Sequence, residues 1–299
     1  MASTLEIKRH IQSVRSISQV THAMGVVSTA RFRRLQARAE STRAFAERSW
    51  EVLSHLATAA ESEIQDNPMF SGYDELHCIG LIVMTSSRGM VGAYNHNVVA
   101  LVAEYVENLK NRIEEITFEA LTIGKTGRNA LLRLGYHIYA DWELDDKVDI
   151  TTLTPIARAV LDGFQERVFE QVMIAYTPFR RGMRLQPRIQ QLLPLVPMTS
   201  SERREYIYEP TPQELLLSLL PRIVRFQIYQ AFLESLVAEN MSRMTAMQSA
   251  TQNAEHLVEQ LTLAYNKARQ QTITADLLDL IGGSAEMESS SLAPRMAGS

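Results

Sequence analysis

The residues best suited to chemistry are Gly124-Lys125-Thr126, which match the last three positions of a phosphate-binding loop. The full pattern, G-x-x-x-x-G-K-[ST], surrounds the phosphates with backbone N–H groups and reaches them with the lysine. Its first glycine is replaced by Glu119, which falls inside a predicted strand. We therefore predict no nucleotide site here and no bound cofactor.

Other candidate sites are weaker. The turn Gly89 to Gly92 lacks the spacing of a dinucleotide fingerprint and is typical of a strand-to-helix turn, although its polar end could hold an anion. The seven histidines show neither H-x-x-x-H nor H-E-x-x-H spacing, so no metal site is predicted, and His22 is interpreted as a surface residue. Cys78 lies in an apolar run and is expected to be a small buried hydrophobe. No catalytic residue is predicted.

Composition narrows the class of protein further. Of 299 residues, 45% are hydrophobic and 21% charged, with a net charge of −4, which excludes disorder throughout. A single cysteine excludes an internal disulfide. No apolar run is long enough to span a membrane and the start lacks the apolar core of a signal peptide, so we expect neither membrane insertion nor export. The pI near 6.0 argues against nucleic-acid binding.

Both ends of the chain are predicted to be long helices. Residues 3 to 60 contain no proline and one glycine, Gly25, and begin with the capping box Ser3 and Glu6. A second helix, 211–283, begins at the capping residue Thr211 and is expected to end at Gly282-Gly283, leaving 284–299 as a flexible tail. Pro221 can kink this helix or shift its start.

Heptad spacing predicts that these two helices pair. In the second helix, two interleaved rows are Val237, Met244, Thr251, Val258 and Tyr265, and Asn240, Met247, Ala254, Leu261 and Ala268. In the first helix, the expected rows are Ala23, Ala30, Ala37 and Ala44, with Val20, Val27 and Arg34 between them. Antiparallel pairing within one chain is the simplest arrangement. Two separate surface helices, or a parallel homodimer, remain as alternatives.

The segment between them, 61–210, alternates predicted strands and helices, which is typical of a mostly parallel sheet with helices on its faces. Leu185 to Leu193 alternates apolar and polar residues, as an edge or antiparallel strand does. The predicted strands are 78–85, 117–123, 136–139 and 172–177, and the predicted helices are 93–111, 126–134 and 154–167. The expected fold is an α/β, Rossmann-like domain inserted between the arms of a long antiparallel coiled coil.

Charge is concentrated in the first helix. Between residues 31 and 48, six arginines stand against two glutamates, a net charge of +4 in a chain whose total is −4. Such a stretch is either a solvated helix surface or a basic collar that contacts an acidic surface on another protein. Composition and spacing together favour a mechanical or scaffolding protein over an enzyme.

Along nearly its whole length the sequence resembles the gamma subunit family of the rotary F-type ATP synthase. The matching stretches are Ile7–Val14, Val20–Met24 and Val27–Ser28 in the first helix, and Arg243–Met247, Ala250–Ala254, Tyr265–Gln270 and Ile273–Thr274 in the second. Looser matches are Thr85–Gly89 with Gly92 and Asn95, and Gln191–Leu195. The chain departs from the usual family residues at His22, Gly25, Ser87, Gln252 and Asp276.

The resemblance implies a central rotor shaft that couples ion flow through a membrane sector to ATP synthesis or hydrolysis at the beta subunits, while itself remaining non-catalytic. Implied partners are the alpha and beta subunits of the catalytic head, the epsilon subunit and the c-ring, in a complex on the cytoplasmic face of a bacterial plasma membrane. The implied rotor–stator contacts are Met24, Arg31, Arg33, Arg34, Arg243, Arg269, Gln270 and Thr274. Two hypotheses from other classes are a coiled-coil signalling scaffold carrying a ligand-binding α/β module, and a Rossmann-like enzyme with helical arms.

Overall fold

The computed structural model describes residues 4–59, 67–182, 184–195, 209 and 211–291. The chain divides into two compact units, one formed by Met1–Gly25 with Met247–Ser299 and the other by Val26–Ala246. Two long helices, α1 (Thr4–Ala59) and α7 (Pro212–Ser291), contribute to both units. No helix within the described ranges is long and apolar enough to cross a membrane.

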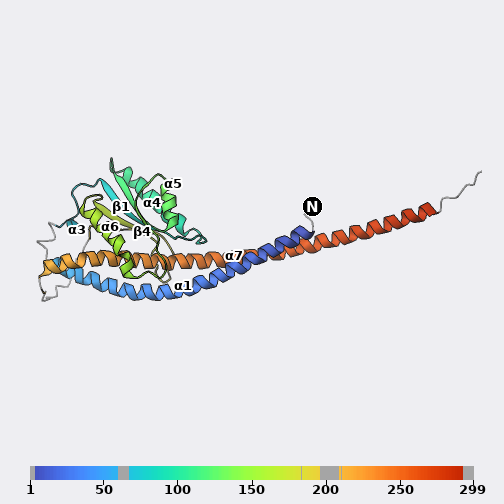
Figure 1. Ribbon diagram of the computed structural model, residues 1–299, viewed down its shortest axis with the longest axis horizontal. Helices are drawn as coiled ribbons and strands as arrows, with labels where there is room; N and C mark the ends of the chain where they lie inside the picture. The colour runs from blue at the N-terminus through green and yellow to red at the C-terminus, as the bar shows by residue number, and fades with distance from the viewer. Residues whose placement is uncertain (1–3, 60–66, 183, 196–208, 210, 292–299) are drawn as a thin grey trace, which may run out of the picture. The chain divides into compact units, whose positions relative to one another are not determined.

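In the first unit, α1 and α7 lie side by side and antiparallel (Figure 1). The hydroxyl oxygens of Thr21 and Thr251 are 2.8 Å apart. A Cβ atom placed on Gly25 would lie 3.6 Å from that of Met247. Moving four residues forward along α1 therefore corresponds to moving four residues back along α7. This confirms the predicted antiparallel pairing within one chain.

The rows that form the seam were predicted correctly for only one helix. In α7, both predicted rows are buried or half-buried. In α1 the predicted rows are wrong, because Val20 and Val27 are more than half exposed and Ala23, Ala30 and Ala37 are exposed as well. The α1 residues that are buried or half-buried instead lie in two other heptad rows: Val14, Thr21, Ser28 and Leu35, and Ile11, Ser18, Gly25, Phe32 and Ala39.

The ends of α7 differ in how well they follow the sequence pattern. The Thr211 hydroxyl accepts a hydrogen bond from the Glu214 N–H at 3.2 Å, which confirms the predicted N-terminal cap. The helix then runs through Pro221 and past Gly282-Gly283, where its end was expected, to Ser291. A glycine costs a helix only about 1 kcal/mol relative to alanine, so a pair of glycines need not end it. The expected cap Ser3 lies outside the described residues.

The inserted domain contains one five-stranded sheet in the order β3-β2-β1-β4-β5. Strands β1 (Cys78–Met84), β2 (Thr117–Ile123), β3 (His137–Trp142) and β4 (Gln171–Tyr176) are parallel, and β5 (Arg188–Leu193) is antiparallel to β4 at the edge. Each strand overlaps a strand predicted from the sequence, including the antiparallel edge strand. The α/β fold class is therefore confirmed.

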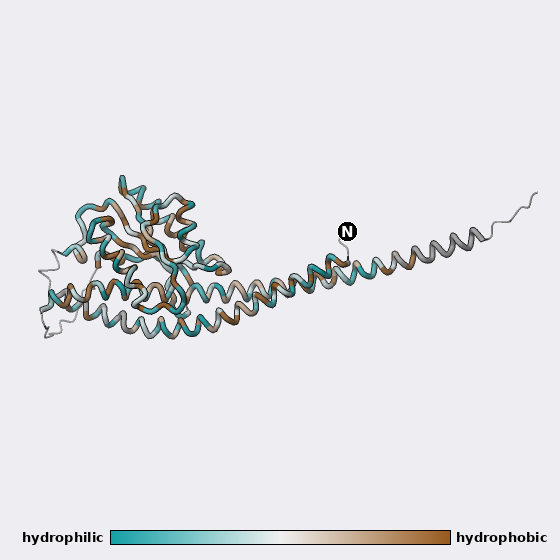
Figure 2. Tube along the Cα trace, viewed as in Figure 1, coloured by the Kyte–Doolittle hydropathy of each residue, from teal (hydrophilic) through white to brown (hydrophobic). Residues whose placement is uncertain are grey.

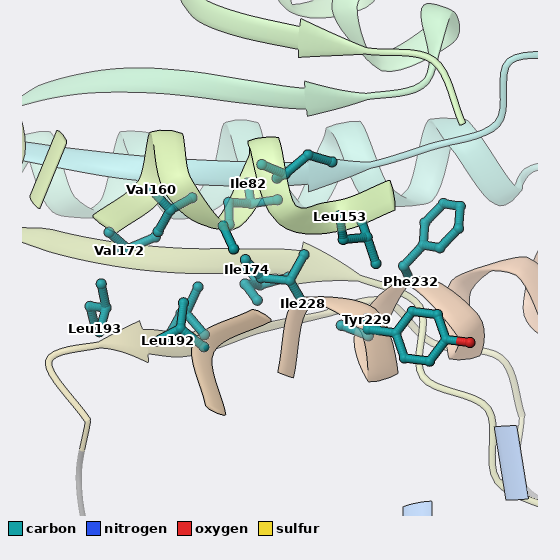
Figure 3. Packing of buried hydrophobic residues seen from close by; sticks show 14 of the residues in the cluster. Ile82, Leu153, Val160, Val172, Ile174, Leu192, Leu193, Ile228, Tyr229 and Phe232 are labelled. Atoms are coloured by element: carbon teal, nitrogen blue, oxygen red, sulfur yellow. The ribbon is translucent and has the colours of Figure 1, made fainter. Parts of the chain in front are cut away.

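Helices cover both faces of this sheet (Figure 1). One face packs against α4 (Tyr94–Lys110) and α5 (Lys125–Arg133). The other packs against α6 (Thr154–Gln165) and the part of α7 between residues 216 and 237, with Ile174 of β4 close to Ile228 of α7 (Figure 3). Two short helices, α3 (Pro68–Ser71) and η1 (Ile150–Leu153), complete the described elements. Hydrophobic residues are concentrated along the central strands (Figure 2).

A single aromatic ring joins β1 to α6. Phe169 is fully buried, and its ring lies against two glycines. A Cβ atom would lie 2.9 Å from the ring at Gly80 in β1 and 2.5 Å from it at Gly163 in α6. Both distances are shorter than a carbon–carbon contact, so the close approach of strand and helix depends on the absence of side chains there.

Candidate functional site

The turn that resembles a phosphate loop is used for packing. Gly124 has a φ of 106° and precedes α5, where the Gly127 N–H donates a hydrogen bond to the Thr85 hydroxyl at 2.8 Å. A Cβ atom on Gly124 would lie 2.2 Å from the Thr85 carbonyl oxygen. These glycines therefore let the β2–α5 turn approach the end of β1, and Thr85 occupies an N–H group that a phosphate would need.

The turn after β1 also satisfies its own polar groups. The Ser86 N–H donates to Asn95 Oδ1 at 2.9 Å, and Asn95 Nδ2 donates to the Ser86 hydroxyl at 2.7 Å. Gly92 has a φ of 58°, which favours glycine, and confirms the predicted strand-to-helix turn. Among the described residues, no group of three or more His, Cys, Asp or Glu side chains is placed to hold a metal ion.

Two predictions about single residues are confirmed. Cys78 is a buried free thiol on the α6 and α7 side of the sheet, and burial raises its pKa. His22 is exposed on α1. Cys78 is packed among apolar side chains, as an unreactive structural cysteine is.

The basic stretch of α1 meets an acidic loop of its own chain. Asp146 lies between β3 and η1, and its carboxylate is 3.0 Å from Arg34 and 3.6 Å from Arg31. Asp149 pairs with Arg38 at 3.5 Å. The Asp146 side chain is only 11% exposed, so the loop presses against the helix at this point. Arg31, Arg33 and Arg34 are the arginines of this stretch that were expected to contact the stator. Asp146 brings two of them, Arg31 and Arg34, together.

The remaining arginines of the stretch behave differently from one another. Arg43 pairs with the buried carboxylate of Glu234 at 2.8 Å and also donates to the Phe179 carbonyl oxygen. Arg48 pairs with Glu51 at 3.2 Å. Arg33 is exposed and forms no ion pair with any residue that the structure describes. Most of the positive charge seen in the sequence is thus balanced by carboxylates of the same chain, and Arg33 is the member without an ion pair among the described residues.

Arg243 is buried inside the second unit. Its side chain is 9% exposed, pairs with Glu239 at 2.7 Å, and lies 3.5 Å from the Arg88 carbonyl oxygen of the β1–α4 turn. Nearby, the Tyr94 hydroxyl donates to the Ser235 carbonyl oxygen at 3.2 Å. Burial raises the pKa of Glu239 and of Tyr94. Within this chain, Arg243 fixes α7 to the turn that precedes α4.

The other expected contact residues lie in the first unit. Met24 is half-buried in α1, whereas Arg269, Gln270 and Thr274 are exposed on α7. Thr4, the first residue of α1, precedes Thr21 by 17 positions, so the register places it opposite Ala268, which follows Thr251 by the same number of positions. The part of α7 after residue 268 therefore extends beyond α1 (Figure 1).

The extension of α7 exposes three large apolar side chains among polar ones. Ile273 is 46% exposed, Leu277 54% and Leu278 64%. Exposed apolar side chains that lie close together are typical of a surface that contacts another molecule. Of these three residues, only Ile273 lies in a stretch that the sequence matched to the family, and the register of α1 was needed to show that all three lie beyond its end.

Comparison with known proteins identifies relatives over nearly the whole chain. The family model described as ATP synthase matches residues 3–287. The chain is 36% identical to the ATP synthase gamma chain of Dehalococcoides mccartyi, over 96% of this chain and 100% of the relative. It is 34% identical to the ATP synthase gamma chain of Chloroflexus aurantiacus, over 97% and 100% of the two chains.

Solved structures share the fold. A chain in the mitochondrial ATP synthase of Euglena gracilis superposes with a TM-score of 0.64 at 14% identity, covering 99% of this chain and 98% of that one. A chain in the central stalk and c-ring of the Tetrahymena thermophila mitochondrial ATP synthase superposes with a TM-score of 0.57 at 23% identity, covering 77% and 99%.

Proposed function

Because the chain belongs to the ATP synthase gamma-chain family, we propose that the exposed apolar extension of α7 and the exposed basic residues of α1 transmit torque to the catalytic head. The chain is the central rotor subunit of a membrane-associated F-type ATP synthase. It couples ion flow to ATP synthesis or hydrolysis and carries no catalytic site of its own.

The proposed partners are the alpha and beta subunits of the head, the epsilon subunit and the c-ring. Their support comes from the fold shared with chains in central stalk, F1 and c-ring assemblies. The bacterial gamma chains among the relatives support a further proposal, that the complex lies on the cytoplasmic face of the plasma membrane.

The observation that carries the proposal is the extension of α7 beyond the start of α1. Its exposed side chains Ile273, Leu277 and Leu278 would be costly in water, at about 25 cal/mol for each Å² left unburied. We assign this surface to an apolar bearing in the alpha and beta ring. In this assignment, Arg269, Gln270 and Thr274 provide polar contacts around the apolar ones.

The mechanism follows from differential contact. An asymmetric shaft touches each beta subunit with different residues, so each rotational position favours a different conformation of each nucleotide site. Only contacts whose free energy differs between these conformations shift their populations. Arg33, exposed and unpaired among the described residues, is the collar residue best placed for such a contact. Asp146 orients Arg31 and Arg34 beside it.

A rotation assay tests the proposal. The complex is reconstituted with its head fixed to a surface and with a bead attached through an Arg112→Cys variant, because Arg112 is exposed at the end of α4. A Cys78→Ser background leaves one reactive thiol. We expect the bead to rotate in one direction when ATP is supplied and to stop when ATP is removed. A bead that does not rotate while the head hydrolyses ATP would contradict the rotor assignment.

The scaffold hypothesis predicts a different use of the same seam. A coiled-coil scaffold would form its seam between two copies of the chain. Here the Thr21 and Thr251 pair, and the packing of Gly25 on Met247, form it within one chain.

A further inference from the structure

A cavity of about 460 Å³ lies between α1, η1 and α7 in the second unit. Its volume falls in the range of about 300–1,000 Å³ that is usual for small-molecule sites. The walls are mainly apolar, from Val52 of α1, Ile150 of η1, and Leu219, Ile223 and Phe226 of α7. None of the rotor contacts assigned above lines it.

The same cavity carries an excess of positive charge. Arg48, Arg222 and Arg225 line it, and among the described residues only Arg48 of these three has a carboxylate partner, Glu51. Arg225 donates to the Thr154 hydroxyl at 3.2 Å. Neither Arg222 nor Arg225 forms an ion pair with any residue in the described part of the chain.

Two hydrogen-bond donors at the cavity are left without partners. Arg225 Nε and Gln227 Nε2 each have less than 1 Å² of exposed surface and no acceptor among the described residues. Both residues line the cavity. A buried donor without an acceptor is unfavourable, and an anion that reached either nitrogen would supply the missing hydrogen bond.

We propose that this cavity binds a fatty acid, with the carboxylate at Arg222 and Arg225 and the alkyl chain against the apolar walls. The class of ligand follows from the lining. A compact anion such as phosphate would leave the apolar walls unused, and a neutral hydrocarbon would give the Arg222 and Arg225 guanidinium groups no negative charge to pair with. A single-chain amphiphile with one negative charge fits both the apolar walls and the two arginines. This inference does not depend on the rotor function.

Calorimetric titration of the full chain with sodium laurate tests the inference, below the micelle concentration and at about 0.15 M salt. We expect saturable binding of one laurate per chain. Acetate, which has the carboxylate without the tail, should not bind measurably. Dodecyltrimethylammonium, which has the tail with the opposite charge, should bind at least about tenfold more weakly, because it cannot form charge-assisted hydrogen bonds with the arginines.

Four variants separate charge from shape. Arg225→Gln should weaken laurate binding by at least about tenfold. Arg222→Gln should weaken it as well, and because Arg222 is exposed this variant stays informative if Arg225→Gln fails to fold. Val52→Trp fills the cavity while keeping every charge, and should also weaken binding. Arg133→Gln, at an exposed arginine of α5, is the matched control and should bind like the wild type.

Three results would overturn the inference. The first is laurate heat that does not saturate at one ligand per chain. The second is equal affinity for laurate and for the dodecyl cation. The third is wild-type affinity in folded Arg222→Gln, Arg225→Gln or Val52→Trp chains. Circular dichroism and the melting temperature establish that each variant is folded.

Discussion

Thr21 of α1 and Thr251 of α7 meet in the seam between the two helices, with their hydroxyl oxygens 2.8 Å apart. Both residues are less than 10% exposed. A polar pair inside a helical seam is less stabilising than a pair of leucines, but it disfavours other registers, because a shift places each hydroxyl against an apolar side chain of the partner helix. Each hydroxyl also reaches a carbonyl oxygen of its own helix, Ser18 for Thr21 and Met247 for Thr251. This pair therefore fixes how the two ends of the chain align in the first unit.

The Thr21 and Thr251 pair predicts a crosslink. In a Cys78→Ser background, Thr21→Cys with Thr251→Cys should form a disulfide within one chain under mild oxidation, because the two side chains already touch. Non-reducing electrophoresis measures this as a faster-moving monomer. Ala23→Cys with Thr251→Cys is the control and should not crosslink, since Ala23 is exposed. Disulfide found only in dimers would contradict the pairing.

The contact between Gly80 and Phe169 predicts a loss of stability. Gly80→Ala places a methyl group 2.9 Å from the fully buried Phe169 ring, whose far end already lies close to Gly163. We expect the free energy of unfolding to fall by about 1–3 kcal/mol. Gly89→Ala is the matched control, because no atom lies within 4 Å of its added Cβ. It should change the free energy of unfolding by less than about 0.5 kcal/mol. Urea unfolding distinguishes the two.

The collar gives a prediction about coupling. Arg33→Glu should leave the melting temperature of the isolated chain unchanged, because Arg33 is exposed and forms no ion pair among the described residues. In the reconstituted complex it should change ATP turnover and weaken ion pumping, with an effect that shrinks as salt rises. Arg33→Lys keeps the charge and serves as control. Unchanged turnover and pumping at every salt concentration would assign Arg33 to a solvated surface.

A neighbouring arginine should behave in the opposite way. Arg34→Glu brings a carboxylate to Asp146, which pairs with Arg34 at 3.0 Å in the wild type. We expect this variant to lower the free energy of unfolding of the isolated chain by up to about 1 kcal/mol at low salt. An Arg34→Glu chain as stable as Arg33→Glu would show that the ion pair with Asp146 contributes nothing.

Cys78 should resist alkylation in the folded chain. Burial raises the pKa of its thiol, so little thiolate is present at neutral pH, and the sulfur is packed in the core. Iodoacetamide should therefore label Cys78 slowly in buffer and rapidly in urea, as measured by mass spectrometry. Because the folded pKa is raised, the stability gained from the protonated thiol is present below pH 9.0 and is lost as pH rises through the folded pKa. Rapid labelling without denaturant would contradict the burial of Cys78.

The isolated chain should not bind ATP at the Gly124-Lys125-Thr126 turn. Glu119 lies in strand β2, and the Gly127 N–H already donates to Thr85. Calorimetric titration should give no saturable heat at micromolar ATP. Stoichiometric binding that Lys125→Ala abolished would show that the turn opens to accept a phosphate.

The sequence alone was enough to predict the inserted domain and the seam of α7. Apolar runs such as Cys78–Met84 are buried on both faces, and the strand–helix alternation permits few arrangements other than a mostly parallel sheet. The seam of α7 was also readable, because its rows carry Val237, Met247 and Leu261, whose hydrophobicity stands out at heptad spacing.

The seam of α1 was not readable, because its buried rows mix polar and small residues with apolar ones, while apolar residues also stand at heptad spacing on the exposed surface. Thr21, Ser28 and Gly25 face α7, while Val20 and Val27 face solvent. Hydrophobic periodicity identifies a buried surface only when the partner of that surface is apolar. Here Thr251 presents a hydroxyl to Thr21, and the large side chain of Met247 packs against Gly25, so polar and small residues are favoured in the seam.

The charge of α1 also shows the difference between what the sequence determines and what only the tertiary structure decides. The sequence determined that six arginines lie between residues 31 and 48, and that two long helices frame an α/β domain. Only the tertiary structure decided that Asp146 and Asp149, more than 100 residues away, pair with Arg31, Arg34 and Arg38, and that Glu234 pairs with Arg43. The reason is physical, since an ion pair depends on the distance between two charges in space, and a sequence fixes that distance only for near neighbours.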